Sequence, residues 1–111
     1  MATGRLGALD QSATTYQTLY TVPASTFTVA TVSFCNRSGS AVTVRLAVTT
    51  ASTTPPTAPA NTEFLEYDAQ ILANGVLERT GIVLDTGKIL SVYASATSVS
   101  CVAMGIETTT A

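Results

Sequence analysis

The sequence predicts an all-β fold, namely a single-domain antiparallel β-sandwich of jelly-roll or Ig-like type with seven or eight strands. Thr and Ser supply 31 of the 111 residues, a composition typical of strands and turns. No stretch has the i, i+3, i+4, i+7 apolar spacing of a long amphipathic helix. Hydrophobic residues make up 46% of the chain and charged residues 11%, so the chain can build one modest core.

The clearest strand spans residues 42–49, where large apolar residues occupy every second position. These residues are Val42, Val44, Leu46 and Val48. Period-two alternation is typical of a strand with one face in the core. Residues 27–35 form another strand just before it, and Asn, Ser and Gly at 36–40 supply a turn. We therefore expect these two strands to form a hairpin.

Turn residues mark the other strands. Residues 16–22 precede Pro23, which lacks the N–H that a strand ladder needs. The second half of the chain adds strands at 64–71, 76–84, 89–94 and 99–106, with turns at 74–75 and 85–87. We expect Gly81 to bend or bulge the strand that contains it.

The segments outside these strands are the candidate contacts to partners. Residues 50–61 form a long Pro-rich loop, which serves either as a partner surface or as an extended connection between two sheets. The candidate loop residues are Thr53, Thr54, Pro55, Pro56, Thr57, Pro59 and Asn61. We assign residues 11–107 to the sandwich, 1–10 to an N-terminal arm and 108–111 to a C-terminal tail.

The two terminal segments have too few apolar residues to fold alone. If they are ordered, we expect a neighbouring chain to order them. Arg5, Leu6 and Leu9 are the candidate contact residues of the arm.

The charge pattern argues against nucleic acid and membranes as partners. The net charge is −2, and the five basic residues are spread singly, so no face collects phosphate contacts. The longest uncharged stretch, residues 11–36, is rich in Thr, Ser and Gln and does not suit a membrane span. Residues 1–10 lack the apolar segment of a secretory signal, so we expect synthesis in a cytoplasm. Asn36-Arg37-Ser38 matches the glycosylation triplet, but without secretion it should be a plain turn.

The usual catalytic sets are missing from the sequence. Histidine is absent, which removes Ser-His-Asp and Cys-His relays and imidazole metal ligands. A Ser-Lys pair using Lys88, or a carboxylate pair among Glu63, Glu66 and Asp68, lies in no recognisable catalytic frame, and the three acidic residues suit a solvated strand edge. We expect no enzymatic activity, no cofactor, no metal and no small-molecule substrate.

Residues 83–87 read Val-Leu-Asp-Thr-Gly, which resembles the active-site turn of retroviral-type aspartic proteases. That family places the turn early in its domain, and too little chain follows Gly87 to supply a flap and a second apolar-Gly element. Asp-x-Gly is also an ordinary hairpin turn, because Asp bonds its own backbone and Gly accepts a positive φ. We predict a turn here.

The cysteines and tyrosines allow two readings each. Cys35 and Cys101 are expected to be buried free thiols, or a disulfide if their strands are neighbours at suitable distance. A glycan-binding module would cluster Tyr, Asn and Asp in adjoining loops. The four tyrosines, Tyr16, Tyr20, Tyr67 and Tyr93, are scattered over predicted strands instead.

Five segments carry a family resemblance in their order along the chain. They are Leu-Tyr-Thr-Val-Pro-Ala at 19–24, Val-Ser-Phe-Cys-Asn-Arg at 32–37, Glu-Arg-Thr-Gly-Ile-Val-Leu at 78–84, Val-Tyr-Ala-Ser at 92–95 and Gly-Ile-Glu at 105–107. In this order they resemble the small virion-associated structural proteins of tailed bacteriophages. The resemblance spans residues 6–107 and departs at Lys88, where an acidic residue is more usual, and in the variable Pro-rich loop.

The resemblance implies a non-enzymatic β-sandwich of the virion, made in the host cytoplasm. It implies a capsid decoration or cement protein that stabilises the head by symmetric self-association, as a trimer or dimer, and by contacts to the major capsid protein. The alternatives are a tail, baseplate or fibre-associated structural protein, or a receptor- or glycan-binding module on the same fold.

Overall fold

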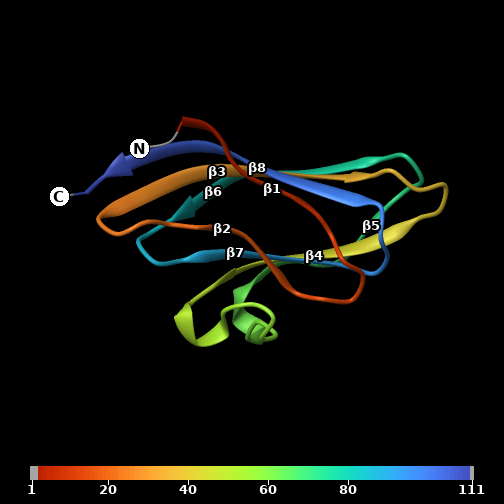
Figure 1. Ribbon diagram of the computed structural model, residues 1–111, viewed down its shortest axis with the longest axis horizontal. Helices are drawn as coiled ribbons and strands as arrows, with labels where there is room; N and C mark the ends of the chain where they lie inside the picture. The colour runs from red at the N-terminus through yellow and green to blue at the C-terminus, as the bar shows by residue number, and fades with distance from the viewer. Residues whose placement is uncertain (1–2, 111) are drawn as a thin grey trace.

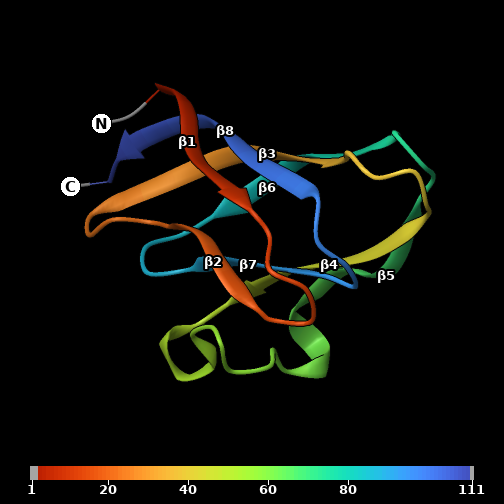
Figure 2. The same ribbon diagram turned by 45° about the vertical axis from the view of Figure 1, so that its right-hand side comes forward.

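The computed structural model describes residues 3–110, which form eight strands in two four-stranded antiparallel sheets packed face to face (Figures 1 and 2). The strands are β1 (Thr3–Asp10), β2 (Gln17–Thr21), β3 (Thr26–Asn36), β4 (Val42–Thr49), β5 (Phe64–Ile71), β6 (Val76–Leu84), β7 (Ile89–Ala94) and β8 (Val99–Thr109). Two short 3₁₀ turns, η1 (Ala51–Thr53) and η2 (Asn61–Glu63), lie between β4 and β5. The predicted all-β sandwich is confirmed.

The strand order identifies the sandwich as a jelly roll. Sheet A has the order β1-β8-β3-β6, and sheet B has the order β2-β7-β4-β5. Strand 1 therefore pairs with 8, 2 with 7, 3 with 6 and 4 with 5, as if one long hairpin had been wrapped across two sheets. Of the two topologies that the sequence predicts, the structure has the jelly roll.

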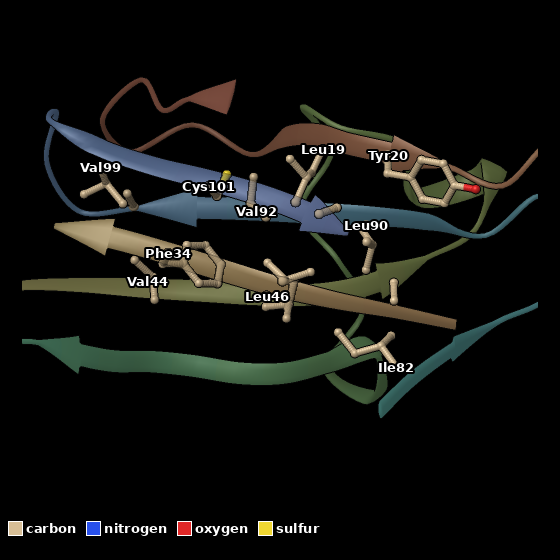
Figure 3. Close-up of a cluster of buried hydrophobic side chains, with 14 of the residues drawn as sticks. Leu19, Tyr20, Phe34, Val44, Leu46, Ile82, Leu90, Val92, Val99 and Cys101 are labelled. Atoms are coloured by element: carbon tan, nitrogen blue, oxygen red, sulfur yellow. The ribbon is translucent and has the colours of Figure 1, made fainter. Parts of the chain in front are cut away.

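The core lies between the sheets and follows the alternation in the sequence. Along β3, Thr28, Ala30, Val32 and Phe34 are buried, while the residues between them face outward. Figure 3 shows side chains from both sheets meeting in this layer, including Phe34 of sheet A and Leu46 of sheet B. Each fully buried large side chain stabilises the fold by about 1.5–3 kcal/mol relative to leaving it exposed.

The predicted hairpin of residues 27–35 with 42–49 is wrong. Both segments are strands, but β3 pairs with β6 and β8 in sheet A, whereas β4 pairs with β5 and β7 in sheet B. The connection between them crosses from one sheet to the other. The reason is that the Asn36 side chain, fully buried, turns inward and binds the backbone of the connecting segments.

The Asn36 side chain uses both ends of its amide. Its Nδ2 donates to the carbonyl oxygens of Ser40 (2.8 Å), Ile71 (3.2 Å) and Leu72 (3.1 Å). Its Oδ1 accepts from the backbone N–H (3.0 Å) and the hydroxyl (2.7 Å) of Ser38. Asn36 thus joins the β3–β4 and β5–β6 connections at one end of the sandwich. The triplet at 36–38 is therefore more than the plain turn that the sequence predicts.

The N-terminal arm expected at residues 1–10 is instead the outer strand of sheet A. Residues 3–10 pair with β8 of the same chain, and no neighbouring chain is needed to order them. Backbone hydrogen bonds to the free edge of β8 hold this segment in place although it has few apolar residues. Leu6 and Leu9 pack against the core, and Arg5 faces solvent. Residues 1 and 2 lie outside the described residues.

The expected C-terminal tail is likewise mostly strand. Thr108 and Thr109 continue β8, and the N–H of Thr110 donates to the carbonyl of Ser25 at 2.9 Å. Residue 111 lies outside the described residues. The sandwich thus extends beyond the predicted limits of 11–107 at both ends.

The remaining turns agree with the sequence. Gly81 has φ +71°, and the β3–β6 register shifts opposite it, so the predicted bulge is confirmed. Asp85, Thr86 and Gly87 form a turn, with Gly87 at φ +81° and the Lys88 N–H donating to the Asp85 carbonyl. The Lys88 ammonium lies 3.1 Å from the Asp85 carboxylate and lowers the pKa of that carboxyl group.

A buried polar group links the two sheets. The hydroxyl of Tyr20 on β2 is hydrogen-bonded to Thr28 Oγ1 on β3 (2.9 Å) and to the Glu107 carboxylate on β8. Burial and the Glu107 carboxylate raise the pKa of Tyr20 from 10.0 to about 12. The neutral hydroxyl is therefore the form that the folded state favours.

We expect this hydroxyl to make unfolding pH-dependent in alkali. Between pH 10 and about 12 the unfolded chain loses the Tyr20 proton while the folded chain keeps it, so the free energy of unfolding falls by about 3 kcal/mol. Below pH 10 the contribution is fully present. Urea unfolding from pH 8 to 12 should show a smaller loss of unfolding free energy for Tyr20→Phe than for wild type. The matched control Tyr67→Phe, on the outer surface, should lose as much unfolding free energy as wild type. Equal losses in both variants would contradict the role of the Tyr20 hydroxyl.

The two cysteines are free and lie on opposite faces of sheet A. In the β3–β8 register, Phe34 is opposite Cys101 and Cys35 is opposite Ser100, so the thiols of the two neighbouring strands point away from each other. Both thiols are free as predicted and the disulfide is not formed, but the predicted burial holds for Cys101 and is wrong for Cys35. Burial raises the pKa of the Cys101 thiol to about 12, whereas Cys35 is only half-buried on the outer face.

We expect the two thiols to react at very different rates. A disulfide reagent such as 5,5′-dithiobis(2-nitrobenzoate) should label Cys35 in the native protein and Cys101 only after unfolding, since the reactive species is an accessible thiolate. The Cys35→Ser variant should therefore show no fast phase in buffer and one thiol in denaturant. Fast native labelling of that variant would contradict the burial of Cys101.

Candidate interaction surfaces

The Pro-rich loop lies against the outer face of sheet B (Figures 1 and 2). Ala47, Thr49, Ile89 and Ser91 sit at outward positions of β4 and β7, yet each is at most 5% exposed. The loop between Thr49 and β5 covers this part of the sheet. The predicted long loop is confirmed, but the expectation that it connects two sheets is wrong, because β4 and β5 are neighbours in sheet B; the loop also shields apolar surface.

The candidate loop residues do not form one exposed group. Pro59 is buried, and Thr53 and Pro55 are half-buried. Thr53 donates its hydroxyl to Glu63 Oε2 (3.1 Å), and Glu63 Oε1 accepts the N–H of Ala60 (2.8 Å), so the loop is closed on itself. The exposed candidates are Thr54, Pro56, Thr57 and Asn61. Their contact with a partner stays a prediction.

A second surface on sheet B gathers aromatic rings around an arginine. We call it the aromatic–arginine cluster; it consists of Tyr16, Arg45, Phe64, Tyr67, Asp68 and Tyr93. The guanidinium carbon lies 4.3 Å from the ring centroid of Tyr67 and 4.6 Å from that of Tyr93. Arg45 Nε is 2.7 Å from Asp68 Oδ1, and Nη1 donates to the Tyr16 hydroxyl at 2.9 Å.

A β-bulge builds this cluster. In the β4–β5 register, Val44 is opposite Ala69 and Leu46 is opposite Glu66, so Arg45 faces two residues, Tyr67 and Asp68. Asp68 has φ 52°, a left-handed conformation that Asp tolerates better than most residues. The bulge therefore lets neighbouring residues act on the same guanidinium, one by its ring and one by its carboxylate.

Within the cluster, the positive charge of Arg45 is balanced by the negative charge of Asp68. The hydrogen bond to Asp68 is the main cause of a raised pKa of Arg45, and it outweighs the opposing effect of burial. The Arg45 side chain is 20% exposed, whereas Tyr67 is 59% exposed and presents its ring to solvent. A ligand would therefore meet Tyr67 first, with the arginine held rigidly behind it.

The expectation that the tyrosines are scattered is wrong for three of them. Tyr16, Tyr67 and Tyr93 come from three separate segments that adjoin on one face of sheet B. Tyr20 alone is elsewhere, in the core. The sequence contains no signal for this, because the contacts depend on the pairing of β4 with both β5 and β7.

The outer face of sheet A carries a third surface, an apolar one. We call it the apolar face; its members are Phe27 (36% exposed), Val29 (45%), Val83 (70%), Met104 (37%) and Ile106 (55%). In the strand registers Val29 is opposite both Val83 and Ile106, so these three form one continuous row across β6, β3 and β8. Phe27 and Met104 lie beside this row on β3 and β8.

The described part of the chain offers no enclosed site. Residues 3–110 contain no pocket and no group of three or more His, Cys, Asp or Glu placed to hold a metal ion. Within the same residues, no helix is long and apolar enough to cross a membrane. Comparisons with family models, curated proteins and solved structures gave no match for this chain.

Proposed function

We propose that this chain is a non-enzymatic structural protein of a tailed-bacteriophage virion, and that it decorates the capsid through contacts with itself and with the major capsid protein. The observation that carries the proposal is the apolar face of sheet A. A role in the tail, baseplate or fibre is the alternative within the same class.

The apolar face supports a role in assembly because its side chains contribute no burial free energy while the protein is isolated in water. Five large apolar side chains on a rigid sheet remain in water, although 20 other hydrophobic residues of the described chain are buried. Contiguous exposed apolar patches typically mark surfaces that pack against another macromolecule. A protein whose function is to hold neighbours together needs such a surface and no pocket.

Two further points agree with a particle-building role. The eight-stranded jelly roll is an architecture that recurs in capsid and lectin domains. Four of the five segments that resemble phage virion proteins fall on structural features here, since they contain Tyr20, Asn36, Gly81 and Glu107. Because the resembling segments contain residues that hold this fold together, the resemblance favours a fold shared with phage virion proteins and a structural role.

A cryo-EM reconstruction of the particle tests the proposal by locating and counting copies of this chain. Hundreds of copies spread over the shell support the decoration role. Copies confined to the tail or fibres contradict decoration and leave the alternative. Absence from the purified particle overturns the virion role altogether.

The aromatic–arginine cluster favours a second candidate, a glycan- or receptor-binding module. Sugars stack on exposed aromatic rings, and Tyr67 presents such a ring, held in place by Arg45 and Asp68. A glycan array followed by titration of any hit tests this candidate. Tyr67→Ala should abolish the binding, while Thr57→Ala in the nearby exposed loop should not; the absence of any hit counts against the module.

A further inference from the structure

Two charged residues, Arg5 and Glu78, lie on the two edge strands of the sheet that carries the apolar face. Four ion pairs are present within residues 3–110: Arg37–Asp10, Arg45–Asp68, Arg79–Glu66 and Lys88–Asp85. Glu63 and Glu107 accept hydrogen bonds instead, whereas the side chains of Arg5 and Glu78 make no hydrogen bond or ion pair with any described residue. Arg5 is on β1 and Glu78 on β6, the two edge strands of sheet A.

The strand registers fix where these charges lie relative to the apolar row. Arg5 is opposite Met104, which is opposite Thr31. Glu78 is opposite Ser33, two residues further along β3 and therefore one outward position away, about 6.7 Å along the strand. The outer face thus carries a positive charge on one edge strand and a negative charge on the other, nearly level with each other and displaced along the strands from the apolar row.

We propose that a second copy of this chain covers the apolar face, with the two sheets A packed face to face about a twofold axis parallel to the strands between β8 and β3. This symmetry places β1 of one copy over β6 of the other, so Arg5 of each faces Glu78 of its partner. It also places Val29 of each copy against Ile106 of its partner. A surface with opposite charges on its two edges is complementary to its own copy in this orientation.

The available area agrees with a dimer. The five apolar side chains expose on the order of 500 Å² together, at the upper end of patches on ordinary monomers. A standard interface needs about 800 Å² per partner. The surrounding outward residues, including Thr3, Arg5, Thr31, Ser33 and Glu78, supply the rest. Two packed sheets at about 10 Å separation are also an ordinary arrangement in proteins.

This inference deepens the proposed function and rests on it for the role of the dimer as a building unit of the particle. The dimer itself can be measured on the purified full chain. Sedimentation equilibrium from about 1 to 100 μM is expected to show a monomer–dimer equilibrium. A monomer throughout this range, or a trimer, would overturn the proposal.

Point variants test the face. Val83→Asp buries a charge in the proposed interface and should raise the dimer dissociation constant at least tenfold. The matched control Leu72→Asp introduces the same charge at an equally exposed apolar residue (69%) in the β5–β6 connection and should leave dimerisation unchanged. Thermal melts should show that both variants fold. A dimer unaffected by Val83→Asp would place the interface elsewhere and overturn the proposal.

Charge reversal tests the orientation. Arg5→Glu and Glu78→Arg should each weaken the dimer about three- to tenfold, and the double variant should restore it, because both pairs are then reversed together. Failure of the double variant to recover would overturn the twofold arrangement.

The two proposals can fail separately. Wild-type protein that binds particles but stays monomeric contradicts the dimer and leaves the virion role intact. A face-dependent dimer that is absent from particles contradicts the virion role and leaves the interface intact.

Discussion

Gly105→Ala is expected to destabilise the protein by about 3 kcal/mol or more, a large share of the ~5–15 kcal/mol that holds a small domain folded. A Cβ at this position would lie 2.0 Å from the Val29 carbonyl oxygen and 2.9 Å from the Ala30 Cα. These are backbone atoms of the neighbouring strand, so no side chain can move to relieve the clash. The β8–β3 pairing, which holds sheet A together at its centre, would have to open locally.

Urea or thermal unfolding of the purified variant measures this effect. Gly39→Ala is the matched control, because a Cβ there meets no atom within 4 Å and the residue lacks a positive φ. The control is expected to be neutral or slightly stabilising, since alanine reduces the conformational entropy of the unfolded chain. Equal stability of the two variants would show that β3 and β8 can separate at little cost.

Asn36→Ala is expected to cost about 3–5 kcal/mol, the second large effect. The substitution removes three donated and two accepted hydrogen bonds at once. The carbonyls of Ile71 and Leu72 would lose a donor in a site with no exposure at Asn36 itself. Both connections at that end of the sandwich should loosen together.

Hydrogen exchange separates this effect from a simple loss of packing. The amide of Ser38 should lose protection in Asn36→Ala, together with that of Gly75, which belongs to the other connection. Asn36→Asp, which keeps the shape but turns a donor toward three carbonyls into an acceptor, should be destabilised as well. Asn61→Ala, an exposed residue of the Pro-rich loop, serves as the control. If only the 36–41 connection loosens, the proposed coupling of the two connections is wrong.

Strand positions were predictable because the core imposes a period of two on the sequence. The segments 42–49, 64–71, 76–84 and 89–94 coincide with β4 to β7. Gly81 and the turn at 85–87 were also predictable, because glycine at a positive φ has a local cause.

Pairing between strands could not be predicted in the same way. A turn that returns a strand to its own sheet and one that crosses to the other sheet use the same residues. Asn36 decides between them only through the carbonyls of Ile71 and Leu72, which are distant in sequence. The N-terminal arm was mispredicted for a related reason: β1 is held by backbone bonds to β8, and these leave no apolar pattern.

For the candidate surfaces too, local features could be predicted from the sequence, but contacts that depend on strand pairing could not. The Pro-rich loop was recognisable from composition alone, although its contact with sheet B was not. The aromatic–arginine cluster depends on the bulge at Asp68 and on two strand pairings, so Tyr16 and Tyr93 gave no sign of being neighbours. The apolar face became visible only when alternate residues of β3, β6 and β8 were aligned by register.

The pairing of β1 with β8 has a consequence for how the protein is made. Strand β8 is the partner of both β1 and β3, so these two strands of sheet A lack a neighbour until β8 has been synthesised. Sheet B is complete earlier, since its last strand, β7, ends at Ala94. Folding dominated by contacts between distant segments is slow. On the ribosome the nascent chain would therefore leave β1 and one edge of β3 without a hydrogen-bonding partner until β8 emerges, which makes the pairing of β8 the step at which sheet A closes.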